Sequence, residues 1–195
     1  MYKVVCFDLD DTLSKEIKYL ESAYKEIARY AARHCEGCSD SVNILEAKSF
    51  KEMLRAYHEG KNTFDELNSF LGLSIHVKDY LDIYRNFKPT WQLLPEVSDL
   101  LNRLKEDGCI LGLISDGRSV QQRNKFNALG LNRWINNNDV VISEEFGSEK
   151  PSLANYEYFM KRYPNAEFTY VGDNPKKDFF GRHSVGDCVH ARVTN

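Results

Sequence analysis

Carboxylate side chains gather at two places in the sequence, each directly after a short apolar run. Asp8 and Asp10 follow the apolar residues 4–7. Asp173 and Asp178 follow a second apolar run that ends just before them. Carboxylates packed together repel each other unless a cation lies among them, and oxygen ligands completed by water suit Mg²⁺. The four acids together therefore indicate a cation site, whereas one of them alone would more often cap a helix or form a turn.

A serine and a lysine lie between these acids in the sequence. Ser115 follows the apolar residues 109–114, and Lys150 lies in a polar segment after the apolar residues 140–142. A lysine placed between two pairs of acids, with each acid near the end of an apolar run, favours one shared site over unrelated turn residues.

The apolar runs that precede these polar residues have the composition of buried parallel strands. Strands buried on both faces are nearly continuous in apolar residues, and five runs fit this description: residues 4–7, 109–114, 140–142, 168–171 and 188–193. Helical patterns follow four of them, over residues 95–108, 119–129, 152–163 and 176–185. The alternation predicts an α/β fold with a Rossmann-like parallel sheet flanked by helices, in which ligands bind at the carboxyl ends of the strands.

Residues 14–88 interrupt this alternation after the first strand. Apolar residues recur every three or four positions from Leu13 to Ala31, which is typical of one face of an amphipathic helix. Three shorter helical patterns follow, and no strand pattern is evident. We therefore expect an α/β core domain formed by residues 1–13 and 89–195, with an all-helical domain of residues 14–88 inserted into it.

Composition and charge exclude several classes of protein. The 195 residues carry a formal net charge of -3, with 42% hydrophobic and 28% charged residues. This balance is that of a globular protein, and it offers no electrostatic argument for nucleic acid or an anionic membrane as a partner. No apolar run approaches the roughly 20 residues of a membrane span, and the short N-terminal run ends in an acid, unlike a signal peptide. Five cysteines, an odd number, fit a reducing compartment, so we expect a cytoplasmic protein. We also expect a monomer or a weak homodimer.

Four segments that carry these polar residues resemble the motifs of the haloacid dehalogenase-like (HAD) hydrolase superfamily. Residues 7–13 (FDLDDTL) resemble motif I, and residues 113–117 (LISDG) resemble motif II. Lys150, followed by a proline, resembles motif III, and residues 172–178 (GDNPKKD) resemble motif IV. The motifs stand in the family's order and near its spacing. An insert between motifs I and II is a helical type-I cap in that family, and residues 14–88 occupy this place.

The resemblance implies a catalytic role for four residues. Asp8 would be the nucleophile that becomes an aspartyl-phosphate. Asp10 would protonate the leaving alkoxide and then accept a proton from the hydrolytic water. Ser115 would bind phosphoryl oxygens, and Lys150 would neutralise charge between Asp8 and the phosphoryl group.

The resemblance also implies substrate and metal contacts. Thr12 would fix the turn of motif I, and the backbone N–H groups near Asp116 and Gly117 would help Ser115 and Lys150 to hold the substrate's phosphoryl group. Mg²⁺ would be bound by Asp8, the backbone carbonyl of Asp10, and Asp173. Asp178 would bind the ion directly or through water, or would orient Lys150.

These roles predict a Mg²⁺-dependent phosphatase acting on a small phosphate monoester, such as a sugar phosphate or a nucleotide. Asp10 favours phosphoryl chemistry over dehalogenation, because a halide leaves without a proton. Sugar phosphomutases and phosphonatases share the motifs and remain open as alternatives. A receiver domain fits less well, since its phospho-accepting aspartate follows a later strand. A catalytically inactive HAD scaffold that only binds ligand is the non-enzyme alternative, although no motif residue is missing.

Overall fold

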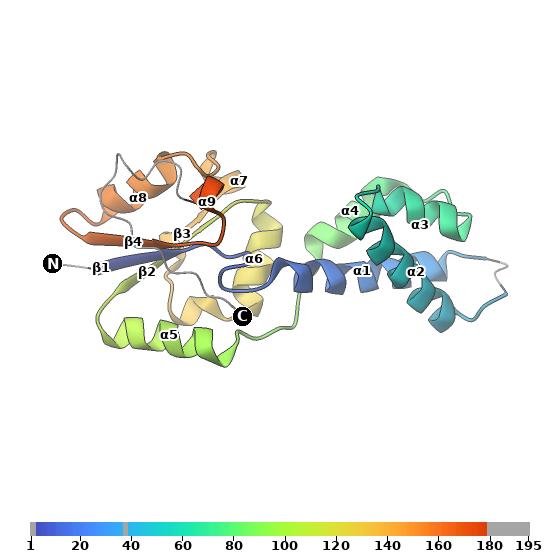
Figure 1. The fold of residues 1–195 in the computed structure, drawn as a ribbon, viewed down its shortest axis with the longest axis horizontal. Coiled ribbons are helices and arrows are strands. Elements are labelled where there is room, and N and C mark those ends of the chain that lie inside the picture. Colours follow the sequence, from blue (N-terminus) through green and yellow to red (C-terminus); the bar gives the residue numbers. More distant parts are fainter. Residues whose placement is uncertain (1–2, 37–38, 179–195) are drawn as a thin grey trace. The chain divides into compact units, whose positions relative to one another are not determined.

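The computed structural model describes residues 3–36 and 39–178. The chain divides into two compact units, one formed by Met1–Glu16 with Thr90–Asn195 and the other by Ile17–Pro89. The domains expected from the sequence were residues 1–13 with 89–195 and residues 14–88. The first unit contains a β-sheet, and the described residues of the second form helices and connecting segments only (Figure 1).

The sheet consists of four parallel strands in the order β3-β2-β1-β4. Their bounds are Lys3–Phe7 for β1, Ile110–Ser115 for β2, Val140–Ile142 for β3 and Glu167–Val171 for β4. Because all the pairs are parallel, the carboxyl ends of the strands meet at one edge. The predicted α/β fold with a Rossmann-like parallel sheet is confirmed. The predicted strand of residues 188–193 lies outside the described residues.

Both faces of the sheet are covered, which explains its continuous apolar runs. Side chains alternate between faces along a strand, so Val5 and Phe7 of β1 enter one hydrophobic cluster, and Val4 and Cys6 enter another. Helices α5 (Pro95–Glu106) and α6 (Ser119–Ala128) pack on the first face, and α8 (Ala154–Arg162) packs on the second (Figure 1).

A glycine allows α8 to pack closely on the sheet. A Cβ atom at Gly112 of β2 would lie 2.5 Å from the ring of Phe159 in α8. No side chain fits in that space, so the close approach of helix and strand depends on glycine at this position.

Two short helices follow strands at the carboxyl edge of the sheet. Helix α7 (Ser143–Phe146) comes directly after β3, and α9 (Pro175–Asp178) comes shortly after β4. The sequence pattern did not predict α7, because four residues are too few for a helical period to be visible. The predicted helix of residues 176–185 can be compared only over its first residues, since α9 ends at the last described residue.

The second unit is built around its own hydrophobic cluster. Its helices are α1 (Glu16–Arg33), which begins at the end of the first unit, α2 (Val42–His58), α3 (Thr63–Leu71) and α4 (Val77–Asn86). Ile27, Met53, Leu67 and Tyr80, one from each helix, are fully buried in this cluster. The part of the predicted stripe from Leu20 to Ala31 is therefore the face of α1 that packs on the other three helices, whereas Leu13 belongs to the cluster of the first unit and Ile17 is exposed.

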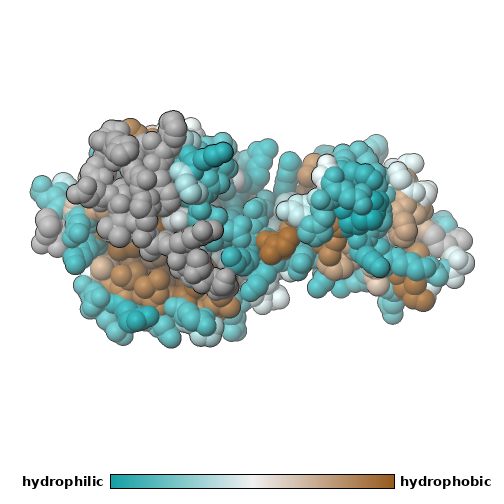
Figure 2. Space-filling view, in the orientation of Figure 1, coloured by the Kyte–Doolittle hydropathy of each residue, from teal (hydrophilic) through white to brown (hydrophobic). Residues whose placement is uncertain are grey.

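Figure 2 shows one face of the molecule, on which hydrophobic residues gather at the lower left and at the right among hydrophilic ones. Hydrophilic residues cover much of the view in Figure 2. Large exposed hydrophobic side chains are scattered along the described chain: Ile17, Val42, Ile44, Tyr57, Phe70, Leu94, Val120 and Phe146. Single residues of this kind are normal on monomeric proteins. Among the described residues, no helix combines the length and the hydrophobicity needed to cross a bilayer.

Candidate active site

The loop after β1 carries the first two acids of the site. The backbone N–H of Asp8 donates to the carbonyl of Val171 at 2.8 Å, which extends the pairing of β1 with β4 by one residue. The chain then turns sharply, with Asp11 at a φ of +56° and the N–H groups of the following residues donating to the carbonyl of Leu9. Aspartate tolerates this left-handed conformation better than most residues. The fully buried Leu9 side chain anchors the turn in the core.

Lys150 lies at the centre of a buried group of polar side chains. Its Nζ donates to Oδ1 of Asp8 at 2.7 Å, to Oδ1 of Asp178 at 2.8 Å and to the hydroxyl of Tyr170 at 3.1 Å. The Tyr170 hydroxyl donates in turn to Oδ1 of Asp178, and the other oxygen of Asp178 accepts from the N–H of Asn174. Three of the predicted site residues are thus brought together by direct contacts.

The acidic side chains around Lys150 outnumber its single ammonium group. Burial raises the pKa of Asp8 to about 7, although the adjacent Lys150 ammonium opposes the shift. Burial alone would lower the pKa of Lys150, but the charges of Asp8 and Asp178 outweigh it and raise that pKa above its usual value. One ammonium therefore faces two carboxyl groups, and a further cation would be stabilised beside them.

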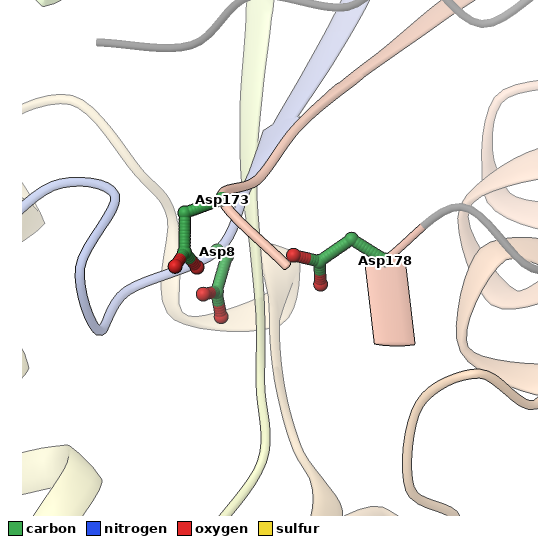
Figure 3. Close-up of side chains that lie close together, drawn as sticks. All are labelled: Asp8, Asp173 and Asp178. Carbon is green, nitrogen blue, oxygen red and sulfur yellow. The ribbon is translucent and has the colours of Figure 1, made fainter. Parts of the chain in front are cut away.

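Three carboxylates form a cluster that could hold such a cation. Oxygen atoms of Asp8, Asp173 and Asp178 all lie within 4.8 Å of one another, and the Asp178 carboxylate is directed toward Asp8 (Figure 3). Partial burial and the neighbouring charge of Asp178 raise the pKa of Asp173. An all-oxygen donor set of this kind fits Mg²⁺. Both oxygens of Asp178 accept hydrogen bonds at 2.8 Å, whereas Oδ2 of Asp8 has only the 3.5 Å contact with Thr12. Asp8 and Asp173 are therefore the candidates for direct ligands, and Asp178 is the candidate for a supporting role.

The Asp10 carboxylate has a different environment from the other acids. Its two oxygens accept hydrogen bonds from Nζ of Lys125 at 2.6 and 2.8 Å, and one also accepts from Nε2 of Gln122 at 3.0 Å. It does not belong to the carboxylate cluster found among the described residues. Its expected metal contact would therefore come from its backbone carbonyl, as the resemblance implies, and this stays a prediction.

The segment after β2 places the residues expected to bind a phosphoryl group. Ser115 is 1% exposed, and its hydroxyl has no hydrogen-bond partner among the described residues. A carboxylate oxygen of Asp116 accepts from the backbone N–H of Lys150 at 3.0 Å, which ties this segment to the lysine. The N–H of Gly117 donates to the Ser143 hydroxyl at 2.9 Å, so it is already engaged. Asp116 thus has a positioning contact, and the substrate contacts of Asp116 and Gly117 stay predictions.

Thr12 makes only a long contact with the nucleophile candidate. Its hydroxyl lies 3.5 Å from Oδ2 of Asp8, at the limit of a hydrogen bond. This position fits the expected place of Thr12 in the turn of motif I. A contact between Thr12 and substrate stays a prediction.

Several site residues were not predicted from the sequence. Gln122 and Lys125 lie three positions apart, which places them on one face of α6, but the same spacing is common on solvated helix surfaces. Tyr170 stands within an apolar run, where a tyrosine is ordinarily read as part of the core. Ser143 contacts Gly117 only because β3 lies next to β2 in the sheet. Each of these contacts depends on packing between distant segments.

Gly172 provides a test of how Asp178 is held. A Cβ atom at Gly172 would lie 2.5 Å from a carboxylate oxygen of Asp178, so Gly172→Ala must displace a side chain that is fixed by several hydrogen bonds. We expect the unfolding free energy to fall by about 1–3 kcal/mol and Mg²⁺ affinity to fall as well, as measured by denaturation and isothermal titration calorimetry. Gly108→Ala is the control, because a Cβ there would have no described atom within 4 Å other than those of its chain neighbours. It should lower stability through its positive φ and leave Mg²⁺ affinity unchanged; an equal loss of affinity in both variants would contradict the prediction.

Comparison with known proteins identifies the family. The model described as haloacid dehalogenase-like hydrolase matches residues 2–183. A glyceraldehyde 3-phosphate phosphatase of Methanocaldococcus jannaschii is 33% identical over 194 residues, covering 95% of this chain and 82% of that protein. A protein of the same name from Methanopyrus kandleri is 32% identical over 200 residues, with the same coverage. The chain belongs to the haloacid dehalogenase-like hydrolase family, which confirms the resemblance found in its motifs.

Solved structures agree with this assignment at the level of the fold. The crystal structure of the Bacillus subtilis HAD-hydrolase YfnB bound to magnesium matches with a TM-score of 0.60 and 23% identity. The match covers 96% of this chain and 87% of that one. The two proteins therefore share the α/β core fold.

Proposed function

We propose that this protein is a Mg²⁺-dependent phosphatase that hydrolyses small phosphate monoesters. The observation that carries the proposal is the buried Ser115 hydroxyl, which lies at the same edge of the sheet as the Lys150–Asp8 pair and has no hydrogen-bond partner in the described part of the chain. A buried polar group without a hydrogen bond costs free energy, and a phosphoryl oxygen would satisfy it. The carboxylate cluster of Asp8, Asp173 and Asp178 fits the cation that such chemistry uses.

In the proposed first step, an oxygen of Asp8 attacks phosphorus. A bond forms between Asp8 and the phosphoryl group while the bond to the leaving oxygen breaks, and Asp10 gives its proton to that oxygen. Lys150 stabilises negative charge on the attacking carboxylate and the phosphoryl oxygens. Ser115 holds one of these oxygens. When bound, Mg²⁺ would supply further positive charge, held by Asp8 and Asp173.

In the proposed second step, water releases the phosphate. Asp10, now ionised, accepts a proton from water as its oxygen bonds to phosphorus and the bond to Asp8 breaks. The products are inorganic phosphate and the free Asp8 carboxylate, and Asp10 is protonated again for the next cycle.

We propose a small sugar phosphate as the substrate class. The relatives named glyceraldehyde 3-phosphate phosphatase support it, because they match nearly the whole chain at about one-third identity. A role of the helical unit Ile17–Pro89 as a cap that selects substrate, and a cytoplasmic monomeric or weakly dimeric state, remain proposals from the sequence.

The deciding experiment measures phosphate release from a panel of substrates. The panel contains glyceraldehyde 3-phosphate, hexose phosphates, nucleoside monophosphates and p-nitrophenyl phosphate, each with EDTA and with added Mg²⁺. We expect turnover of at least one small phosphate monoester, loss of turnover in EDTA, and recovery with Mg²⁺. Metal-independent turnover would contradict the mechanism, and isomerisation of a sugar phosphate without phosphate release would indicate a mutase instead.

Ser115→Ala should separate function from stability. Because the hydroxyl has no hydrogen-bond partner within residues 3–36 and 39–178, we expect the unfolding free energy to stay constant or to rise by up to about 1 kcal/mol. The kcat/KM for phosphate monoesters should fall about 10- to 100-fold, since a hydrogen bond to a charged group is worth about 1.5–3 kcal/mol. Denaturation and steady-state kinetics measure the two quantities.

Ser143→Ala is the matched control for this variant. Its hydroxyl accepts from the N–H of Gly117, so its removal should lower the unfolding free energy by about 1 kcal/mol. A stability loss in Ser115→Ala as large as that in Ser143→Ala would contradict the interpretation of Ser115 as a ligand-binding hydroxyl.

A further inference from the structure

Lys125 is a buried cation that the proposed catalytic roles do not use. Its side chain is 1% exposed, and its Nζ contacts both oxygens of the Asp10 carboxylate, at 2.6 and 2.8 Å. Lysine is almost never fully buried unless it is paired, because removing its charge from water is costly. The ion pair with Asp10 offsets that cost, so the two side chains define each other's position.

Gln122 adds a second contact to the same carboxylate. Its Nε2 donates to Oδ2 of Asp10 at 3.0 Å and to the backbone carbonyl of Asp116 at 2.9 Å. This amide therefore links the loop after β1 to the segment after β2. A Cβ atom at Gly117 would lie 2.7 Å from Nε2 of Gln122, so the glycine is what leaves room for the link.

Helix α6 holds Gln122 and Lys125 rigidly. Phe126 and Leu129, at and just beyond the end of this helix, are buried in the hydrophobic cluster that also contains Phe7 and Leu113 of the sheet. The side chains that contact Asp10 thus project from a helix packed on the same strands that carry the site. A carboxylate with both oxygens held from a rigid helix has little freedom to rotate, and proton transfer depends strongly on such alignment.

We propose that Lys125 and Gln122 are positioning residues that align the Asp10 carboxyl group for its two proton transfers. This inference rests on the proposed function: Asp10, which is ionised in its pair with Lys125, takes up a proton before the first step, gives it to the leaving oxygen and regains one from the hydrolytic water. Neither residue needs to touch the substrate. Their effect should therefore be large where the leaving group needs a proton and small where it does not.

The test compares two leaving groups in the variants Lys125→Met and Gln122→Leu, which remove the donors and keep similar side-chain volumes. For an alkyl phosphate, whose alkoxide must be protonated, we expect Lys125→Met to lower kcat/KM by about 100-fold, within the range of a general acid's contribution. For 2,4-dinitrophenyl phosphate, whose leaving group is stable as an anion, the loss should be less than about fivefold. Gln122→Leu should show the same pattern with a smaller alkyl loss.

Two comparisons connect the effect to Asp10. Asp10→Asn should show the same selective loss for alkyl phosphates, and adding Lys125→Met to it should cause little further loss, because both changes disable one group. Arg162→Met is the matched control, since it removes a cation from Asp139 at the start of β3, the end of the strand opposite the site residues. It should leave both kcat/KM values unchanged.

The possible outcomes distinguish a failure of this inference from a failure of the proposed function. An equal loss of kcat/KM for both leaving groups in Lys125→Met would show a general structural role and overturn this inference alone. Additive losses in the double variant would also overturn it. Absence of phosphate release by the wild-type protein from every substrate would overturn the proposed function, and this inference with it. Melting temperatures of all variants show whether each protein is folded under the assay conditions.

Discussion

Asp8→Asn is expected to lower kcat for phosphate release by about 10⁴-fold or more, because an amide cannot form the aspartyl-phosphate. The substitution keeps the shape of the side chain and an oxygen that can accept the hydrogen bond from Lys150. Lys150 also retains its ion pair with Asp178, so the local structure should persist. Single-turnover experiments with a phosphate monoester should show no covalent phosphoryl-protein, whereas the wild-type protein should accumulate it when hydrolysis is slow.

The stability of the same variant should depend on pH in a defined direction. Burial raises the pKa of Asp8 to about 7, above the value of about 3.9 in the unfolded chain. The folded state therefore favours the protonated carboxyl group, and this residue's contribution to stability is lost as the pH rises from about 4 to 7. Without metal, Asp8→Asn should melt at a higher temperature than the wild-type protein at pH 8, and the difference should shrink toward pH 4. A variant that keeps substantial turnover, or is less stable at pH 8 than at pH 4 relative to wild type, would contradict the role given to Asp8.

Lys150→Met is expected to affect both stability and catalysis strongly. It leaves the carboxyl groups of Asp8 and Asp178, whose side chains are 9% and 0% exposed, without their ammonium partner. Removing one partner of a buried ion pair costs about 3–5 kcal/mol of unfolding free energy. The kcat/KM should fall about 10²- to 10³-fold, as is typical when a group that stabilises transition-state charge is lost. Chemical denaturation and steady-state kinetics measure these losses.

Added Mg²⁺ should partly reverse the stability loss of Lys150→Met, because the carboxylate cluster that remains can bind a cation. Lys161→Met is the control, since Lys161 is 80% exposed in its ion pair with Glu157. Exposed pairs contribute little, so its effect should stay below about 1 kcal/mol. Equal stability losses in the two lysine variants, or no response of Lys150→Met to Mg²⁺, would contradict this account of the site.

The carboxyl edge of the sheet could be predicted from the sequence because it follows from local patterns. Apolar runs that end in acids identify the strand ends, and parallel pairing brings the ends together, which places Asp8 beside Asp173 and Asp178. The family motifs added Lys150, and the structure places its ammonium between two of these acids.

The contacts between distant helices and loops could not be predicted in the same way. Lys125 and Asp10 are separated by more than one hundred positions, and nothing in their neighbours' types indicates that they meet. Tyr170 bonds to Lys150 only because β4 lies next to β1, an order that the alternating pattern does not specify. The sequence predicts which groups would carry the chemistry, and the packing shows which groups hold them in place.

The strand order determines when the sheet can form during synthesis of the chain. Strand β1 is synthesised first, yet Val4 pairs with Ile110 of β2 and Phe168 of β4. At about 5–20 residues per second, a ribosome needs about ten to thirty seconds to reach the second partner. The helices of the inserted unit have local contacts and can fold in that interval. During the same interval, the apolar strand β1 has neither β2 nor β4 to pair with. The active site should therefore form only after β4 and the following residues up to Asp178 have been synthesised.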